Sequence, residues 1–138
     1  MDNKILKEKM KIFEKMINTA DDNIAEELID SKAAFYTPAK PEPLYGGKGY
    51  LSFVYFMRNG FSDIQWKAKE MVAENNIVAV YWELSGTHDG EFLGVKASGA
   101  KLNTTVMNFY YFNEEGKIIN DVAAEGMIGI LKTLGLSK

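Results

Sequence analysis

The sequence predicts an α+β domain in which a curved antiparallel sheet wraps around N-terminal helices and forms a cone with an internal pocket. Apolar residues recur with the 3.6-residue period of amphipathic helices in the first part of the chain, and from Ser62 they follow the period of long strands. Two hairpin signals divide the strand region, so neighbouring strands should run antiparallel. Strands of about ten residues twist strongly, and a twisted sheet curls around the helices that it covers.

Helical periodicity defines the first two elements. The first helix should end near Thr19. One of Asp21, Asp22 and Asn23 can cap a second helix, with Glu26 placed three residues after Asn23 as in a capping box. The apolar face of the first helix consists of Ile5, Leu6, Met10, Phe13, Met16 and Ile17.

A third helix is expected after a glycine turn formed by Gly46, Gly47 and Gly49, and it should stop near Asn59. The turn lacks the spacing of the phosphate-binding fingerprints, so we expect no nucleotide or flavin cofactor. A short terminal helix is expected over residues 127–134. The apolar stripe of the third helix consists of Tyr50, Phe53, Val54, Phe56 and Met57.

Strand periodicity after Ser62 predicts a meander of long antiparallel strands. Asn75 and Asn76 suit a tight hairpin because asparagine tolerates positive φ, and Gly116 suits a second hairpin. A brief strand at 33–37 should be followed by an irregular loop, because that stretch is rich in proline. The expected long strands cover residues 64–73, 77–87, 102–112 and 117–125, with one loop at 88–101.

Length and composition describe an ordinary globular chain. The 138 residues are 46% hydrophobic with a net charge of −3, so we expect a single domain over residues 1–138. The chain has no cysteine and one histidine, which excludes disulfides, thiol catalysis and multi-histidine metal sites, and we expect no metal. No signal-peptide segment, membrane-spanning run or basic stripe is present, so we expect a cytoplasmic protein that binds neither membrane nor nucleic acid.

Three segments of the strand region stand out: GFSDIQW at 60–66, VAVYW at 78–82 and GTHDGEFLG at 86–94. They resemble the SnoaL-like polyketide cyclase family, which belongs to the nuclear-transport-factor-2-like (NTF2-like) superfamily, and the similarity extends over about residues 34–136. The resemblance implies an NTF2-like, cystatin-like α+β barrel around a pocket. This fold hosts enzymes and plain binding domains alike, so the reaction has to be argued from the site.

The resemblance also implies a catalytic residue. Relatives that close polyketide rings use an acid in the last long strand as general acid/base, and Asp121 matches that acid. Asn120 and Val122 stand where relatives commonly carry another acid and a tryptophan, and Gly126 stands where they carry an aspartate. Strand parity leaves open whether Asp121 or Asn120 faces the pocket. Glu125 shares the parity of Asp121 and either contacts the ligand or caps the terminal helix.

Other polar and aromatic side chains are candidates for the pocket wall. His88 opens the loop after the second long strand, where it either shuttles protons or ties the loop down. Strand alternation points Trp82, Asn108 and Tyr110 inward, and a buried amide such as that of Asn108 needs a partner. Tyr36 and Tyr50 can line the same pocket or belong to the core.

These observations lead to one main hypothesis and two alternatives. The main hypothesis is a cofactor-free cyclase or isomerase that moves protons on a hydrophobic carbonyl compound, with Asp121 as the base. The alternatives are a non-catalytic protein that binds a hydrophobic small molecule in its pocket, and an interaction module that uses the sheet. We also expect a homodimer through the outer sheet face, whose outward residues are Thr105, Met107, Phe109 and Tyr111.

Overall fold

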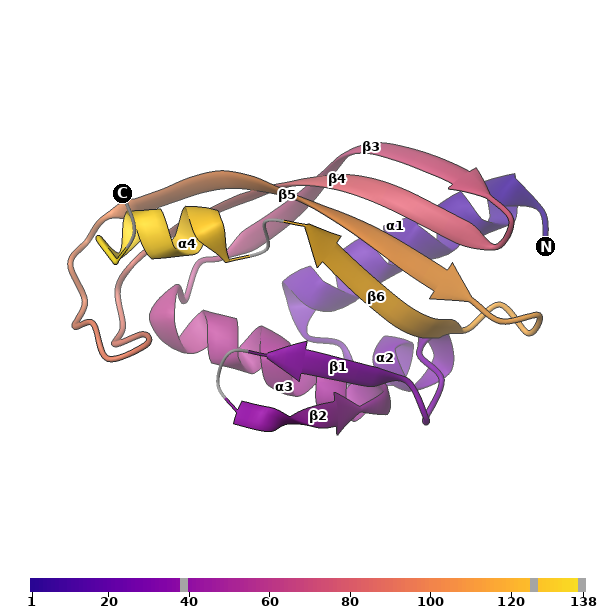
Figure 1. Ribbon diagram of the computed structural model, residues 1–138, viewed down its shortest axis with the longest axis horizontal. Helices are drawn as coiled ribbons and strands as arrows, with labels where there is room; N and C mark the ends of the chain where they lie inside the picture. The colour runs from indigo at the N-terminus through magenta and orange to yellow at the C-terminus, as the bar shows by residue number, and fades with distance from the viewer. Residues whose placement is uncertain (38–39, 125–126, 137–138) are drawn as a thin grey trace.

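The computed structural model describes residues 1–37, 40–124 and 127–136. Three helices and a small hairpin precede a four-stranded sheet, and a short helix follows it (Figure 1). The elements are α1 (Asn3–Thr19), α2 (Asp22–Leu28), β1 (Ala34–Thr37), β2 (Lys40–Tyr45), α3 (Gly46–Gly60), β3 (Gln65–Glu74), β4 (Ile77–Thr87), β5 (Lys101–Phe112), β6 (Ile118–Ala124) and α4 (Ile128–Thr133).

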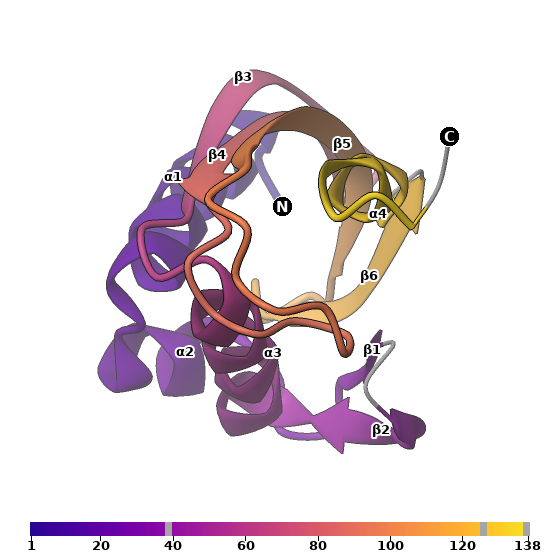
Figure 2. The same cartoon turned by 90° about the vertical axis from the view of Figure 1, so that its left-hand side faces the viewer.

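The large sheet has the order β3-β4-β5-β6, and every pairing in it is antiparallel. Seen end-on, the four strands form an arc, and the helices lie on its concave side (Figure 2). The sheet is strongly curled. It remains open along the described residues, because its edge strands β3 and β6 do not pair with each other. The predicted α+β class, with a curved antiparallel sheet wrapped around the helices, is confirmed.

Both hairpin predictions are confirmed by backbone conformation. Asn75 and Asn76 have φ of 52° and 60°, the left-handed values that a tight hairpin turn requires. Gly116 has φ of 79° in the turn between β5 and β6. These turns join β3 to β4 and β5 to β6, and the resulting registers place Ala73 opposite Val78 and Tyr110 opposite Asp121.

The N-terminal segment differs from the prediction in two places. The capping box is wrong: Asp21 is the N-cap of α2, and its side chain accepts a hydrogen bond from the Ile24 backbone N–H at 3.0 Å. The prediction of an irregular loop in the proline-rich stretch is also wrong, because β2 occupies that stretch and pairs with β1. Proline is tolerated in this small two-stranded sheet because a strand at an edge leaves backbone groups that need no ladder partner.

The core lies between the concave face of the sheet and the helices. Asn18 fastens α1 to the sheet, since its side chain both donates to the Trp66 carbonyl oxygen and accepts from the Trp66 backbone N–H, each at 2.8 Å. Gly47 lets α3 approach α2, because a Cβ there would lie 2.3 Å from the carbonyl oxygen of Ala25. The buried face of α1 consists of Leu6, Met10, Phe13, Met16 and Ile17.

The convex face of the sheet carries exposed apolar side chains. Val72, Ala79, Phe109 and Val122 lie side by side across the four strands, and Val72, Phe109 and Val122 are at least half exposed. Met107 is exposed next to this row. Across the described ranges, none of the helices combines the length and the apolar character needed to cross a membrane.

Candidate functional site

A cavity of about 320 Å³ lies between the concave face of the sheet, α3 and β1. Its wall is predominantly aromatic and aliphatic, as ligand pockets usually are. Tyr36 and Asn120 line it and are exposed, so they mark the side where the cavity meets solvent. The deeper wall includes Phe35, Tyr50, Phe53, Met57, Trp66, Trp82, Leu84, Val106, Asn108, Tyr110 and Asp121.

Asp121 reaches the cavity because of a bulge in β6. Phe112 of β5 pairs with Ile118, but Tyr111 pairs with Asn120, so Ile119 is an extra residue between them. A bulge of one residue reverses which side of the strand the following side chains face. Asp121 therefore lines the cavity on the same side as buried Ile118. The Asn120 side chain accepts a hydrogen bond from the Asp121 backbone N–H at 2.8 Å and stabilises the irregular turn of the strand.

The Asp121 carboxylate sits in an apolar environment with few polar partners. Among the described lining residues it is the one side chain with a formal charge. Burial raises its pKa from the ordinary value of 3.8 to about 6, although hydrogen bonds from Asn108 and Tyr50 act in the opposite direction. The Asn108 amide donates to Asp121 Oδ1 at 2.7 Å, which gives the inward amide its partner. A carboxyl group with such a pKa can both accept and return a proton near neutral pH.

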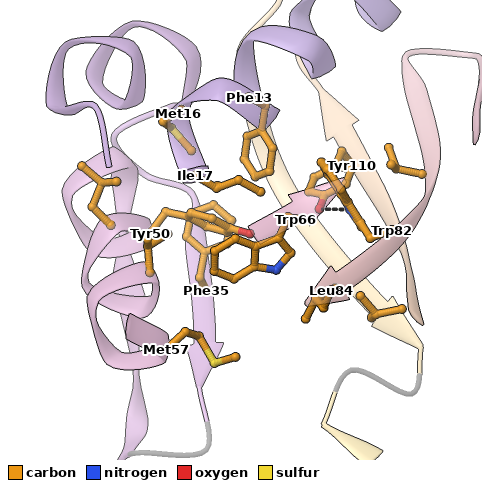
Figure 3. Packing of buried hydrophobic residues seen from close by; sticks show 14 of the residues in the cluster. Phe13, Met16, Ile17, Phe35, Tyr50, Met57, Trp66, Trp82, Leu84 and Tyr110 are labelled. Carbon is orange, nitrogen blue, oxygen red and sulfur yellow. Dashed lines mark hydrogen bonds between the residues drawn. The ribbon is translucent and has the colours of Figure 1, made fainter. Parts of the chain in front are cut away.

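Polar side chains from three other elements gather near this carboxylate. The Trp82 indole Nε1–H on β4 donates to the Tyr110 hydroxyl on β5 at 2.9 Å (Figure 3). The Tyr50 side chain on α3 lies near both Tyr110 and Asp121, so it influences the pKa of each of these groups. Burial, followed by the nearby Asp121 charge, raises the pKa of both tyrosines well above 10, so both remain neutral donors.

Most of the residues predicted to contact a ligand lie together on the cavity wall. Tyr50, Trp82, Asn108 and Tyr110 line its interior, and Tyr36 lies at its open side. Asp121 rather than Asn120 occupies the inward position of β6. Glu125 lies outside the described residues.

His88 is separate from this group. Its ring is fully buried, and it is absent from the residues that line the cavity. Nδ1 lies 2.9 Å from the Ser98 hydroxyl and accepts a hydrogen bond from the Ser98 backbone N–H at 3.3 Å. The ring also packs on Phe61, with 5.5 Å between the ring centroids. These contacts tie the loop between β4 and β5 to the domain, which is the structural role considered for this residue.

Trp66 is a cavity residue that the sequence reasoning did not select. It lies on β3 opposite Leu84 of β4, and its indole lines the cavity. Alternation offered a signal, because Ile64 and Trp66 share the inward face at the start of this strand. The sequence does not show that Trp66 and Asp121 meet, because β3 and β6 are opposite edges of the sheet. Only the curl of the sheet brings the two residues to one cavity (Figure 2).

Comparison with solved structures shows the same fold in bacterial proteins. TsrD from Streptomyces laurentii superposes with a TM-score of 0.83 at 18% identity, covering 99% of this chain and 98% of that one. IdmH from Streptomyces antibioticus superposes with a TM-score of 0.75 at 22% identity, covering 94% and 98%. At these identities the likeness shows the fold.

Sequence comparison gives the family. No curated protein matches the chain. The family model for SnoaL-like polyketide cyclases matches residues 7–134, which includes every element that contributes to the cavity. The chain therefore belongs to the SnoaL-like polyketide cyclase family.

Proposed function

We propose that this protein catalyses cofactor-free proton transfer on a hydrophobic carbonyl compound, leading to cyclisation or isomerisation, with Asp121 as general base and then general acid. The observation that carries the proposal is the position of Asp121 as a charged group in an otherwise uncharged aromatic cavity. A carbonyl group acidifies the adjacent C–H bond, and a positioned carboxylate with a pKa of about 6 is matched to accepting that proton.

The cavity also limits the substrate class. No Lys, Arg or His side chain is among the described lining residues, so a phosphate or carboxylate on the substrate would meet Asp121 without a compensating cation. An uncharged substrate avoids that repulsion. Aromatic walls from Phe35, Tyr50 and Trp82 favour a flat, apolar molecule, because such surfaces bury area without requiring polar partners.

Deuterium exchange on a model ketone tests the proposal without knowledge of the natural substrate. 2-Tetralone is uncharged, bicyclic and acidic next to its carbonyl group. We expect the protein to accelerate exchange of these protons in D2O, followed by 1H NMR. Asp121→Asn should reduce the acceleration by roughly 100-fold or more, the usual contribution of general base catalysis. The exposed turn residue Glu115 provides a matched control, and the Glu115→Gln variant should accelerate exchange of the 2-tetralone protons as much as the wild type does.

The alternative is a ligand-binding protein without catalysis. It is motivated by Asn120 and Val122, which replace an acid and a tryptophan found in relatives. Val122 lies on the convex face and is half exposed, so its replacement does not remove a cavity wall. Binding of 2-tetralone with exchange no faster than in buffer would contradict catalysis and favour this alternative.

We also propose that two copies of the chain associate through the convex face of the sheet. The exposed row of Val72, Phe109 and Val122 continues across all four strands, and Met107 widens it. A two-fold axis through this row would bury each side chain twice, at roughly 1.5–3 kcal/mol for each large apolar side chain. The central position of Phe109 on β5 makes it the critical residue.

Sedimentation equilibrium tests the association. We expect a dimer at micromolar concentration, and Phe109→Glu should convert it to a 15.5 kDa monomer. Ile12 on α1 is also about half exposed but lies away from this face, so Ile12→Glu should leave the dimer intact. A wild-type monomer, or a dimer that survives Phe109→Glu, would contradict the proposed interface.

A further inference from the structure

Removing a proton next to a carbonyl group places negative charge on the carbonyl oxygen, and that oxygen needs a hydrogen-bond donor in a dry cavity. We propose that the Trp66 indole N–H is this donor and binds the carbonyl oxygen while Asp121 takes the adjacent proton. The inference rests on the proposed function and assigns the second catalytic group of the same site.

The two other interior N–H donors, those of Asn108 and Trp82, are already engaged. The Asn108 amide donates to Asp121, and the Trp82 indole N–H donates to Tyr110. The Asp121 charge raises the pKa of both Tyr50 and Tyr110, so their hydroxyls lie on the side of the base. The Asn108 and Trp82 N–H groups cannot turn to a substrate without breaking the hydrogen bonds that they already donate.

Trp66 is different because its indole nitrogen makes no hydrogen bond with any group in the described structure. The residue is only 7% exposed, yet its Nε1 atom keeps some accessible surface. The nitrogen edge of the ring faces the space between the two walls of the cavity (Figure 3). An indole N–H can only donate, so it suits an oxygen that gains charge.

The positions of the two groups in the sheet suit opposite sides of one substrate. Trp66 lies on β3 and Asp121 on β6, the two edges of the curled sheet, and both line the same cavity. The exposed residues Tyr36 and Asn120 also have donors at the open side, but there water competes with them. Trp66 is therefore the interior N–H donor that is free to meet a substrate on the side of the cavity opposite Asp121.

The proton-transfer step is balanced within the substrate and these residues. The C–H bond next to the carbonyl group breaks, and its proton passes to the Asp121 carboxylate. The released electron pair forms a C=C bond while the carbonyl π pair moves to the oxygen, which Trp66 stabilises. In an isomerisation Asp121 returns the proton to another carbon of the same molecule. In a ring closure the new carbon nucleophile attacks a second carbonyl group, and the resulting alkoxide takes the proton.

A pair of matched ligands tests the donor directly. 2-Naphthol places an oxygen on a flat bicyclic ring, and 2-methylnaphthalene has nearly the same shape without it. We expect Trp66→Phe to weaken 2-naphthol binding about tenfold, the effect of losing one hydrogen bond worth about 1.4 kcal/mol, and to change 2-methylnaphthalene binding by less than about threefold. An equal loss for both ligands, or no loss for either, would overturn the inference, because it would leave Trp66 a packing role only.

NMR of the wild-type protein provides a second measurement that does not depend on a variant. The chain has two tryptophans, so a 15N-labelled sample gives two indole N–H signals. The unpaired Trp66 N–H should exchange with solvent faster than the Trp82 N–H, and 2-naphthol should shift the Trp66 signal while 2-methylnaphthalene shifts it much less. A slower Trp66 exchange, or an equal shift with both ligands, would contradict the assignment.

The two proposals can fail separately. If binding of 2-naphthol depends on Trp66 but the protein does not accelerate exchange on 2-tetralone, the oxygen-binding role of Trp66 stands and the proposed catalysis is wrong. If exchange is accelerated and depends on Asp121 but not on Trp66, the base is correct and the donor assignment is wrong.

Discussion

Replacing Asp121 by Asn should stabilise the protein at alkaline pH and destabilise it by about 1 kcal/mol at acid pH. The pKa of Asp121 rises from 3.8 in its ordinary state to about 6 in the folded protein because burial penalises the charged form. The folded state therefore binds the proton more tightly than the unfolded state. The contribution of Asp121 to the stability of the folded protein is therefore most favourable below about pH 4, and it is lost as the pH rises through about 6.

The magnitude follows from that shift. Two pKa units at 1.36 kcal/mol each correspond to roughly 3 kcal/mol lost by the wild type between pH 4 and pH 8. Asn carries no charge at either pH, but its amide cannot accept from both Asn108 and Tyr50, which costs about 1 kcal/mol. We therefore expect Asp121→Asn to be about 2 kcal/mol more stable than the wild type at pH 8.

Urea unfolding followed by tryptophan fluorescence at pH 4, 6 and 8 measures this difference. The gain should appear between pH 4 and pH 8, with similar dependence on urea for both proteins. Glu115→Gln at an exposed turn should show no such gain. A difference that is independent of pH, or a variant that loses stability at pH 8, would refute the argument that the carboxylate is held in an apolar site.

Three further changes probe the network and the sheet. Tyr50→Phe should raise the pKa of Asp121 above 6 by about one unit, because it removes a donor to the carboxylate, and 13C NMR titration measures it; an unchanged pKa would contradict the contact. Asn18→Ala should destabilise the protein by about 2 kcal/mol in urea, because two hydrogen bonds to the Trp66 backbone are lost; a loss below about 0.5 kcal/mol would show the contact is dispensable. Deleting Ile119 should remove the bulge but leave Asp121 opposite Tyr110 and facing the cavity, so the pKa of Asp121 should stay near 6; a pKa that falls toward 3.8 would contradict this register.

Most of the fold follows from residue patterns that are local. The helical period ends at Thr19, where α1 ends, and the alternation of Val78, Val80 and Trp82 matches the buried face of β4. Asn75 and Asn76 form the predicted hairpin because asparagine tolerates the positive φ that the turn requires, whatever its tertiary surroundings. The proline-rich strand β2 was missed because its stability comes from pairing with β1, which local propensity does not report.

The site was predictable in composition but not in geometry. Tyr50, Trp82 and Tyr110 could be selected as inward aromatic residues, yet nothing in the sequence shows that their polar atoms gather near Asp121. That arrangement requires α3, β4, β5 and β6 to come together in the folded chain. Trp66 illustrates the same limit, because its importance depends on a donor that the folded structure leaves without a partner.

The facing of Asp121 shows why a single residue can decide a function. Continued alternation from buried Ile118 would have pointed Asn120 into the cavity and Asp121 away from it. The extra residue Ile119 reverses that order, and the Asn120 side chain secures the change through the Asp121 backbone N–H. A bulge costs ladder hydrogen bonds, so its presence beside the cavity has to be offset by contacts such as this one. The catalytic proposal therefore depends on β6 as a bulged strand, and Asn120 at the open side of the cavity holds the Asp121 backbone in place.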